Sequence, residues 1–180
     1  MIEVVSYDPQ WPREFERERN RLQAAFGNVA ERIEHHGSTA VPGLSAKPII
    51  DIQISVARLQ PMDLYARALI ACGYIHVPHS DDDRCPFFHR PAEWPHMHHV
   101  HVVEAGSREE LQTLTFRDYL RSHTDAARQY ESLKRELARV HDGNDAASRE
   151  AYANAKTPFV AEILGRAAVE SARARSDSTA

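Results

Sequence analysis

Apolar and polar residues alternate in the middle of the chain, and this pattern predicts β-strands. Between positions 50 and 56, isoleucine or valine occupies every even position and a polar residue every odd one. A period of two puts the apolar side chains of a strand 49–56 on one face and Asp51 and Gln53 on the other. In a strand 96–104, the same period places His99 and His101 together and turns His98 to the opposite face. Further strands are expected at residues 2–4, 30–36, 74–77 and 87–90.

Helices are predicted where apolar residues recur at helical spacing between capping and stop signals. They are expected at residues 13–26, 61–72, 108–121, 125–141 and 148–168. Pro9 and Pro12 predict an irregular turn before the first helix, and Gly27 ends that helix. Ser107 and Glu110 have the spacing of a capping box at the start of the third helix.

This order of elements, strands with interspersed helices followed by three helices, favours an α+β fold. We expect a mixed sheet with the helices packed on one side and a helical C-terminal segment. The 180 residues fit one domain, because single domains span roughly 50–250 residues. We place this domain at residues 1–170. Residues 171–180 have only small and charged side chains, which predicts a disordered tail.

The overall composition argues against several classes of partner. The formal net charge of −4 disfavours non-specific binding of DNA or RNA, which needs a basic surface. No run of about 18 apolar residues is present, so no membrane span is expected. The first residues lack the pattern of a signal peptide, and two cysteines make no disulfide framework. We therefore expect a cytoplasmic protein.

A glycine–serine turn precedes a strand that carries a carboxylate, an order that suits a phosphate and a metal ion bound together. Gly37 lets the backbone approach a ligand closely, and N–H groups at such a turn bind anions. Ser38 adds a hydroxyl, and Lys47 lies between the turn and the strand. Asp51 can hold the cation that accompanies nucleotide phosphates. We predict Asp51 and Ser38 as catalytic residues and Gly37, Ser38 and Lys47 as phosphate ligands.

A purely structural interpretation of these residues stays open. Short Gly-Ser motifs are frequent by chance, so the segment can be a tight turn followed by a strand with one aspartate. Exposure is the default for lysine, which would leave Lys47 as a solvated loop cation. Arg117 and Lys156 are further candidate phosphate ligands, although on helices they could equally form surface ion pairs.

Histidines are unusually frequent, since the chain has eleven and seven lie between residues 76 and 101. Imidazole is the commonest metal ligand. His99 and His101 have the i, i+2 spacing that can chelate an ion, and together with Asp51 they are the predicted metal ligands. A solvent-facing polar row on an antiparallel sheet would explain the same spacing. His98 is expected to be a hydrogen-bonded residue near the core.

The motifs above lie within a longer set of recognisable segments. They are residues 7–9 (YDP), 11–12 (WP), 33–35 (IEH), 37–44 (GSTAVPGL), 46–52 (AKPIIDI), 98–103 (HHVHVV) and 116–121 (FRDYLR), with Tyr152 and Lys156. These segments, spread over about residues 2–167, resemble the GrpB family of small bacterial proteins. The resemblance implies a nucleotidyltransferase-like fold, in a family without a settled activity. The same domain also occurs fused to dephospho-coenzyme A kinase in some bacteria.

The resemblance also implies a site, with one departure. The wider nucleotidyltransferase superfamily has Gly-Ser before a strand with two acidic residues two positions apart, and a third acidic residue on a neighbouring strand. Gly37, Ser38 and Asp51 match this pattern, but Gln53 stands at the second acidic position. His99 or His101 would take the third position. A divalent ion (Mg²⁺, Mn²⁺ or Zn²⁺) is expected, and a mixed Asp–His site favours the softer ions over Mg²⁺.

Three functions are consistent with these residues. The first is a metal-dependent nucleotidyltransferase that moves a nucleoside monophosphate from a nucleoside triphosphate to an unknown acceptor. The second is a binding module that keeps a pocket for a nucleotide or a coenzyme A-like ligand but has lost turnover, for which Gln53 is the argument. The third is a histidine-metal hydrolase of phosphate esters. We favour the first, with a small-molecule nucleotide as the expected partner.

Overall fold

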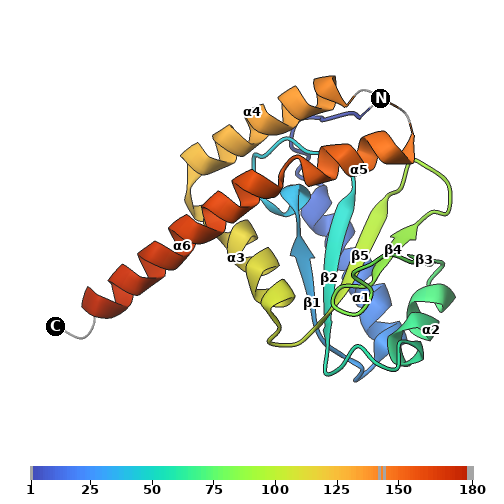
Figure 1. The fold of residues 1–180 in the computed structure, drawn as a ribbon. Helices are drawn as coiled ribbons and strands as arrows, with labels where there is room; N and C mark the ends of the chain where they lie inside the picture. Colours follow the sequence, from blue (N-terminus) through green and yellow to red (C-terminus); the bar gives the residue numbers. More distant parts are fainter. Residues whose placement is uncertain (1, 142, 144, 178–180) are drawn as a thin grey trace.

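The computed structural model describes residues 2–141, 143 and 145–177, and a five-stranded sheet forms its centre (Figure 1). The strands are β1 (Ala30–His36), β2 (Ile50–Val56), β3 (Ile75–Val77), β4 (Phe87–Arg90) and β5 (His98–Glu104). Their spatial order is β1-β2-β5-β4-β3. Strands β2 and β5 run parallel, and the other neighbouring strands are antiparallel. The mixed sheet and the α+β class predicted from the sequence are confirmed.

The register of the central strands brings the polar candidates together. Asp51 on β2 pairs with His36 on β1 and His99 on β5, and Gln53 pairs with His101. Because side chains alternate along a strand, all five residues lie on the same face of the sheet. The expectation that His99 and His101 share a face with Asp51 is therefore confirmed.

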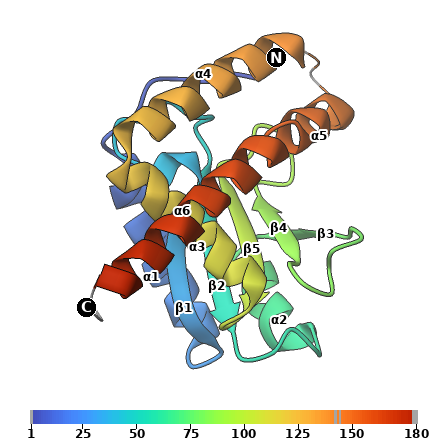
Figure 2. The same cartoon turned by 60° about the vertical axis from the view of Figure 1, so that its left-hand side comes forward.

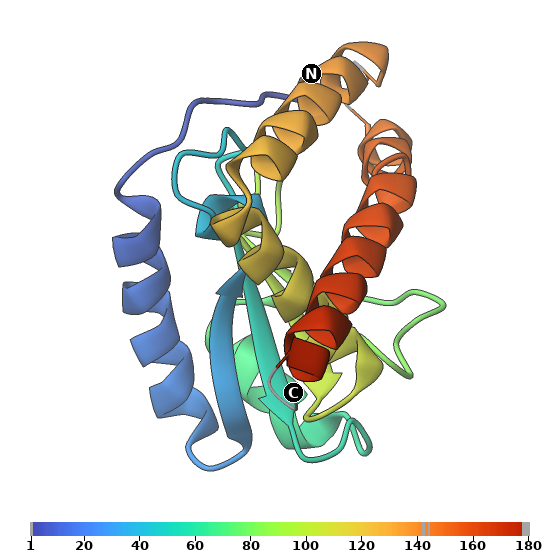
Figure 3. The same cartoon turned by 90° about the vertical axis from the view of Figure 1, so that its left-hand side faces the viewer.

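The helices divide between the two faces of the sheet. They are α1 (Trp11–Phe26), η1 (a short 3-10 helix, Ser38–Ala40), α2 (Asp63–Ala71), α3 (Arg108–Ser122), α4 (Thr124–Val140), α5 (Ala146–Asn154) and α6 (Thr157–Asp177). Helices α1 and α2 cover one face, whereas α3 lies against the other, with α6 beside it (Figures 2 and 3). The prediction that the helices pack on one side is wrong in this respect, because each face has its own helical partners.

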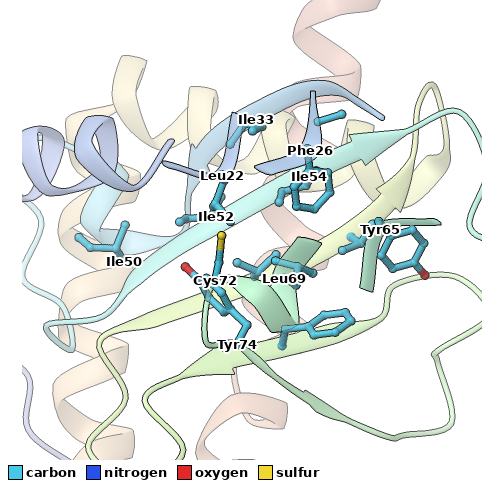
Figure 4. Close-up of a cluster of buried hydrophobic side chains, with 14 of the residues drawn as sticks. Leu22, Phe26, Ile33, Ile50, Ile52, Ile54, Tyr65, Leu69, Cys72 and Tyr74 are labelled. Carbon is cyan, nitrogen blue, oxygen red and sulfur yellow. The ribbon is translucent and has the colours of Figure 1, made fainter. Parts of the chain in front are cut away.

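The face toward α1 and α2 holds the main hydrophobic core (Figure 4). Ile52 and Ile54 of β2, Leu22 of α1 and Leu69 of α2 are all fully buried there. Burying a side chain of this size contributes about 1.5–3 kcal/mol. The isoleucines that alternate along the sequence thus fix which face of β2 points into the core.

The opposite face carries polar side chains, and α3 is attached to it by a buried carboxylate. Glu110 of α3 accepts hydrogen bonds from Ser55 Oγ, from Arg32 Nε at 2.9 Å and from the backbone N–H of Gly106 at 2.6 Å. Burial raises the pKa of Glu110, but the hydrogen bonds from Arg32 and Ser55 outweigh it and lower the pKa overall. Ser107 caps α3, since its side chain accepts from the N–H of Glu110.

The beginning of the chain differs from the prediction. In place of a strand at residues 2–4, Val5 forms a single antiparallel bridge with Ala46, and Ile2 packs against Ala138 and Tyr152. Pro12 lies in the first turn of α1 rather than in an irregular turn. A proline fits there because the N–H it lacks would have no helical partner.

The end of the chain also differs. The single helix predicted at residues 148–168 is two helices, α5 and α6, that are separated at Ala155 and Lys156. Helix α6 continues to Asp177, so the predicted disordered tail is helical over residues 171–177, and its last three positions lie outside the described residues. None of the helices in the described ranges has both the length and the apolarity needed to cross a bilayer.

We predict that Glu110→Ala lowers the free energy of unfolding by about 3 kcal/mol, because it leaves Ser55 and Arg32 without their buried acceptor. Urea denaturation followed by circular dichroism measures the change. Glu109→Ala on the same helix is the control, since its carboxylate lies outside this network, and it should cost less than about 1 kcal/mol. Equal losses in the two variants would contradict the role assigned to Glu110.

Candidate active site

A cavity of about 900 Å³ opens on the polar face of the sheet, at the end where β2 and β5 begin. Segments from both halves of the chain line it, including the loop after β1, the β3–β4 loop, and α4 and α5. Its lining includes the side chains of His36, Ser38, Lys47, Asp51, Trp94, His96, His99, His101, Lys134, Arg149, Tyr152 and Lys156. The cavity therefore brings together six residues that were predicted for the site: Ser38, Lys47, Asp51, His99, His101 and Lys156.

Asp51 is the centre of this cavity. Its Oδ1 lies 3.3 Å from His99 Nδ1, and the other ring nitrogen of His99 lies 3.1 Å from His96 Nδ1. Burial by itself raises the pKa of Asp51, but the hydrogen bond from His99 and the nearby imidazoles hold that pKa well below its usual range. An ionised Asp51 accepts the Nδ1 proton of His99, so in the neutral ring Nε2 is left to accept from His96.

The backbone of Gly37 packs closely against the carboxylate of Asp51. Gly37 has φ 70° and ψ −171°, a region that is essentially restricted to glycine. A Cβ atom at this position would lie 2.3 Å from Asp51 Oδ2. Gly37 therefore supports Asp51 by close contact, while Ser38 lines the cavity itself.

The predicted metal ligands lie near one another without forming a ready-made cage. Within the described residues, no group of three or more His, Cys, Asp or Glu side chains is arranged to hold an ion. The donor chemistry nevertheless fits one, since the buried Nε2 of His36 has no hydrogen-bond partner and His36 lies beside Asp51. A single carboxylate with substrate phosphates and water is a common way to bind Mg²⁺. Metal binding at Asp51, His99 and His101 stays a prediction.

His36 and His101 extend the site as neutral rings. Their centroids are 5.2 Å apart with nearly perpendicular planes. Burial lowers the pKa of His101 to about 3 and also lowers that of His36. Gln53, at the second acidic position, is 1% exposed, and neither atom of its amide has a hydrogen-bond partner in the described structure. The amide is therefore buried beneath the cavity and is absent from its lining.

All three lysines of the chain line the cavity, although nineteen of the 22 basic residues are arginines. The ammonium groups of Lys47 and Lys156 lie 5.1 and 4.6 Å from the ring centroid of Tyr152. Lys134 Nζ lies 4.9 Å from the Tyr130 centroid and donates to the backbone oxygen of Ser45. Burial lowers the pKa of Lys134 to about 7 and that of Lys156 to about 8. The three lysines thus form a cluster of amino groups that can bind an anion.

Two predicted phosphate ligands, Gly37 and Arg117, are not among the residues that line the cavity, and Arg117 is engaged elsewhere. Its guanidinium donates to Glu34 Oε2 at 2.8 Å, to the backbone oxygen of His35 at 2.9 Å and to Asp118 Oδ1 at 2.8 Å. These contacts join α3 to β1. The structure therefore does not support a role for Arg117 in phosphate binding, because its donors are already used in the fold.

Several residues of the site were missed by sequence reasoning. Tyr130 and Lys134 are four positions apart in the predicted helix 125–141, and residues at this spacing share one face of a helix. The scarcity of lysine was a second available signal. No local pattern marked His96, whose orientation depends on its contacts with His89 of β4 and His99 of β5.

Comparison with known proteins identifies the family. The GrpB protein family model matches residues 1–166. The chain belongs to the GrpB family. It is 38% identical to a UPF0157 protein of Halalkalibacterium halodurans over 92% of this chain and 82% of that protein. It is also 32% identical to a dephospho-CoA kinase of Mycolicibacterium paratuberculosis, over 92% of this chain but only 46% of the kinase.

Solved structures place this GrpB chain in a wider fold. The conserved protein GrpB from Enterococcus faecalis superposes with a TM-score of 0.80 at 31% identity, over 92% of this chain and 96% of that one. The Cid1 poly(U) polymerase bound to MgATP gives a TM-score of 0.53 at 12% identity, over 78% of this chain and 46% of the polymerase. The GrpB chain thus has a nucleotidyltransferase-like fold, as the sequence predicted.

We predict that Gly37→Ala destabilises the protein by about 3 kcal/mol or more, since it adds a steric overlap with Asp51 to the strain of a positive φ. Gly43→Ala is the matched control. It has φ 79°, and an added Cβ would meet nothing within 4 Å. The control should cost only about 1 kcal/mol in chemical denaturation, and equal losses would show that the contact with Asp51 contributes nothing.

The lowered pKa of Lys134 predicts a pH dependence of stability. The folded protein releases the Lys134 proton near pH 7, while the unfolded chain keeps it to about pH 10.5. The unfolded state binds more protons across that window, so Lys134 makes the free energy of unfolding rise with pH from about 7 to 10.5. Denaturation at pH 6.5, 8 and 9.5 should show a smaller rise in Lys134→Met. Arg139→Met, which removes an exposed charge of the same helix that is not among the causes of the Lys134 shift, should keep the full rise.

Proposed function

We propose that this GrpB protein binds a nucleoside triphosphate with a divalent cation in the cavity and transfers the nucleoside monophosphate to an acceptor. One observation carries the proposal: all three lysines of the chain converge on the cavity that contains the half-buried, ionised carboxylate of Asp51. Cationic side chains stabilise the charge of a polyphosphate, and a carboxylate at their edge is the group that a phosphate-bound cation needs.

Each residue then has a defined task. Lys47 and Lys156, whose ammonium groups both lie over the ring of Tyr152, contact the phosphates, and Ser38 offers its hydroxyl at the N-terminal end of η1. Asp51 holds the cation, with His99 and His101 of β5 as nitrogen donors on the same face. A bound cation would supply charge neutralisation on the phosphate that reacts. Gly37 keeps Asp51 in position, and His96 keeps the ring of His99 oriented through their hydrogen bond.

The fold supports this choice of ligand. Cid1 poly(U) polymerase, which shares the fold, was solved with MgATP. At 12% identity this likeness concerns the fold alone, so the argument for nucleotide binding rests on the residues of the cavity.

A binding protein without turnover is the second candidate, and Gln53 favours it. The position where a second carboxylate would complete a two-metal site holds a neutral amide that is buried beneath the cavity. A protein of this kind would bind the nucleotide with its cation and release no pyrophosphate. The match to part of a dephospho-CoA kinase extends the range of ligands to test to coenzyme A precursors.

Thermal shift measurements with ATP, CTP, GTP and UTP, each with Mg²⁺ or Mn²⁺, test the proposal. A ligand at 100 times its Kd adds about 2.7 kcal/mol, which corresponds to a rise in Tm of roughly 5–10 °C for a protein of this size. Pyrophosphate release then distinguishes transfer from binding alone. If none of the nucleotides raises Tm with either ion, the proposal is wrong.

Asp51→Asn should remove the part of the Tm shift that depends on the cation, because the amide has no charge to hold it. The shift that remains with EDTA present should match that of the wild type, since the three lysines are unchanged. Asp63→Asn, on the exposed first turn of α2, is the matched control and should behave as wild type. A full cation response in Asp51→Asn would place the ion elsewhere.

A further inference from the structure

The cavity has an aromatic corner that the phosphate and cation sites do not use. Trp94 and His96 both line it, and their ring centroids are 5.1 Å apart at an interplanar angle of 67°. His96 is in turn stacked on His89, with centroids 3.8 Å apart and planes within 10° of parallel. Ring contacts therefore help to hold Trp94 and His96 in position, in addition to the loop backbone.

A planar cationic group already lies over Trp94. The Arg149 guanidinium, carried by α5, is 4.4 Å from the centroid of the indole ring. This separation leaves no room for another ring between them. Trp94 is half-buried, whereas the other tryptophan, Trp11, is 3% exposed and belongs to the core. An aromatic face at the wall of a cavity can stack on a flat ligand that takes the place of the guanidinium over it.

A series of side-chain contacts connects the aromatic corner to Asp51. Trp94 meets His96, His96 is hydrogen-bonded to His99, and His99 contacts Asp51. The charge of Arg149 also lowers the pKa of Lys47, after burial, which shows that the guanidinium lies within electrostatic reach of the lysines. A ligand with a flat ring at Trp94 therefore occupies the same cavity as Lys47 and Asp51, which can contact its charged groups.

We propose that the heterocyclic base of the bound nucleotide stacks on the indole ring of Trp94, in the place of the Arg149 guanidinium. The inference rests on the proposed function and names the part of the cavity that distinguishes a nucleotide from a bare polyphosphate. Base–aromatic stacking tolerates every base, because each has a π face. Trp94 thus recognises a nucleotide as such and contributes little to the choice among bases.

Tryptophan fluorescence tests the inference, since only Trp94 is in the cavity. Saturating ATP with Mg²⁺ should quench the emission of the wild type, and inorganic tripolyphosphate with Mg²⁺ should not. Trp94→Phe should abolish the quenching, because the remaining Trp11 is buried in the core. Quenching that persists in Trp94→Phe, or that tripolyphosphate reproduces, would overturn the inference.

Binding constants give an independent answer. By calorimetry, Trp94→Ala should weaken ATP binding roughly tenfold or more, and should change tripolyphosphate binding less than about twofold. Equal effects on both ligands, or no effect on ATP, would overturn the stacking inference while nucleotide binding itself stands. If ATP fails to bind the wild type, the proposed function and the inference fall together.

Adenosine isolates the displacement of Arg149, since it has a base and no phosphate. Arg149→Ala should make adenosine a better quencher of Trp94, because the competitor for the ring has been removed. Unchanged or weaker quenching would contradict the assignment of the base to this face of the indole.

Discussion

A half-buried carboxylate that must stay ionised is the constraint on which this structure depends. Asp51 keeps its charge because His99 donates to it and further imidazoles lie close by. The backbone of Gly37 closes the space on its other side, so the carboxylate has one position. Burying a charge is costly unless its partners are held in place, and here the two neighbouring strands and the turn after β1 hold them.

The two faces of the sheet differ: one packs the hydrophobic core, and the other carries the cavity. The face toward α1 and α2 is packed with isoleucine and leucine, whereas the other face carries a polar row that runs from the Glu110 network to the cavity. Polar groups along this row are mostly satisfied by ion pairs, as Arg117 and Glu34 show. The exceptions, His36 and Gln53, are concentrated beside Asp51, where a bound ligand or ion can supply the missing partner for His36.

Local patterns predicted much of the fold and the strand-borne part of the site. Alternation along β2 and β5 gave the orientation of Asp51, His98 and His99 correctly, because a period of two has only one solution on a half-buried strand. It could not place Lys134 or Tyr152, which reach the cavity only through tertiary packing of α4 and α5. The same limit explains why Arg117 was predicted as a phosphate ligand: its charge suits a phosphate, but its position on α3 places it in ion pairs of the fold. It also explains why one helix was predicted where α5 and α6 are separate, since Pro158 lies in the first turn of α6.

The bridge between Val5 and Ala46 ties the opening residues to the loop that carries Lys47, and Ile2 packs on Tyr152, the ring shared by Lys47 and Lys156. The first residues thus pack against the part of the cavity wall that carries Tyr152 and Lys47. Anything that loosens this packing, such as a bulky fusion partner attached in front of these residues, should disturb ligand affinity before it disturbs the core. Fusions placed after α6 leave this packing untouched.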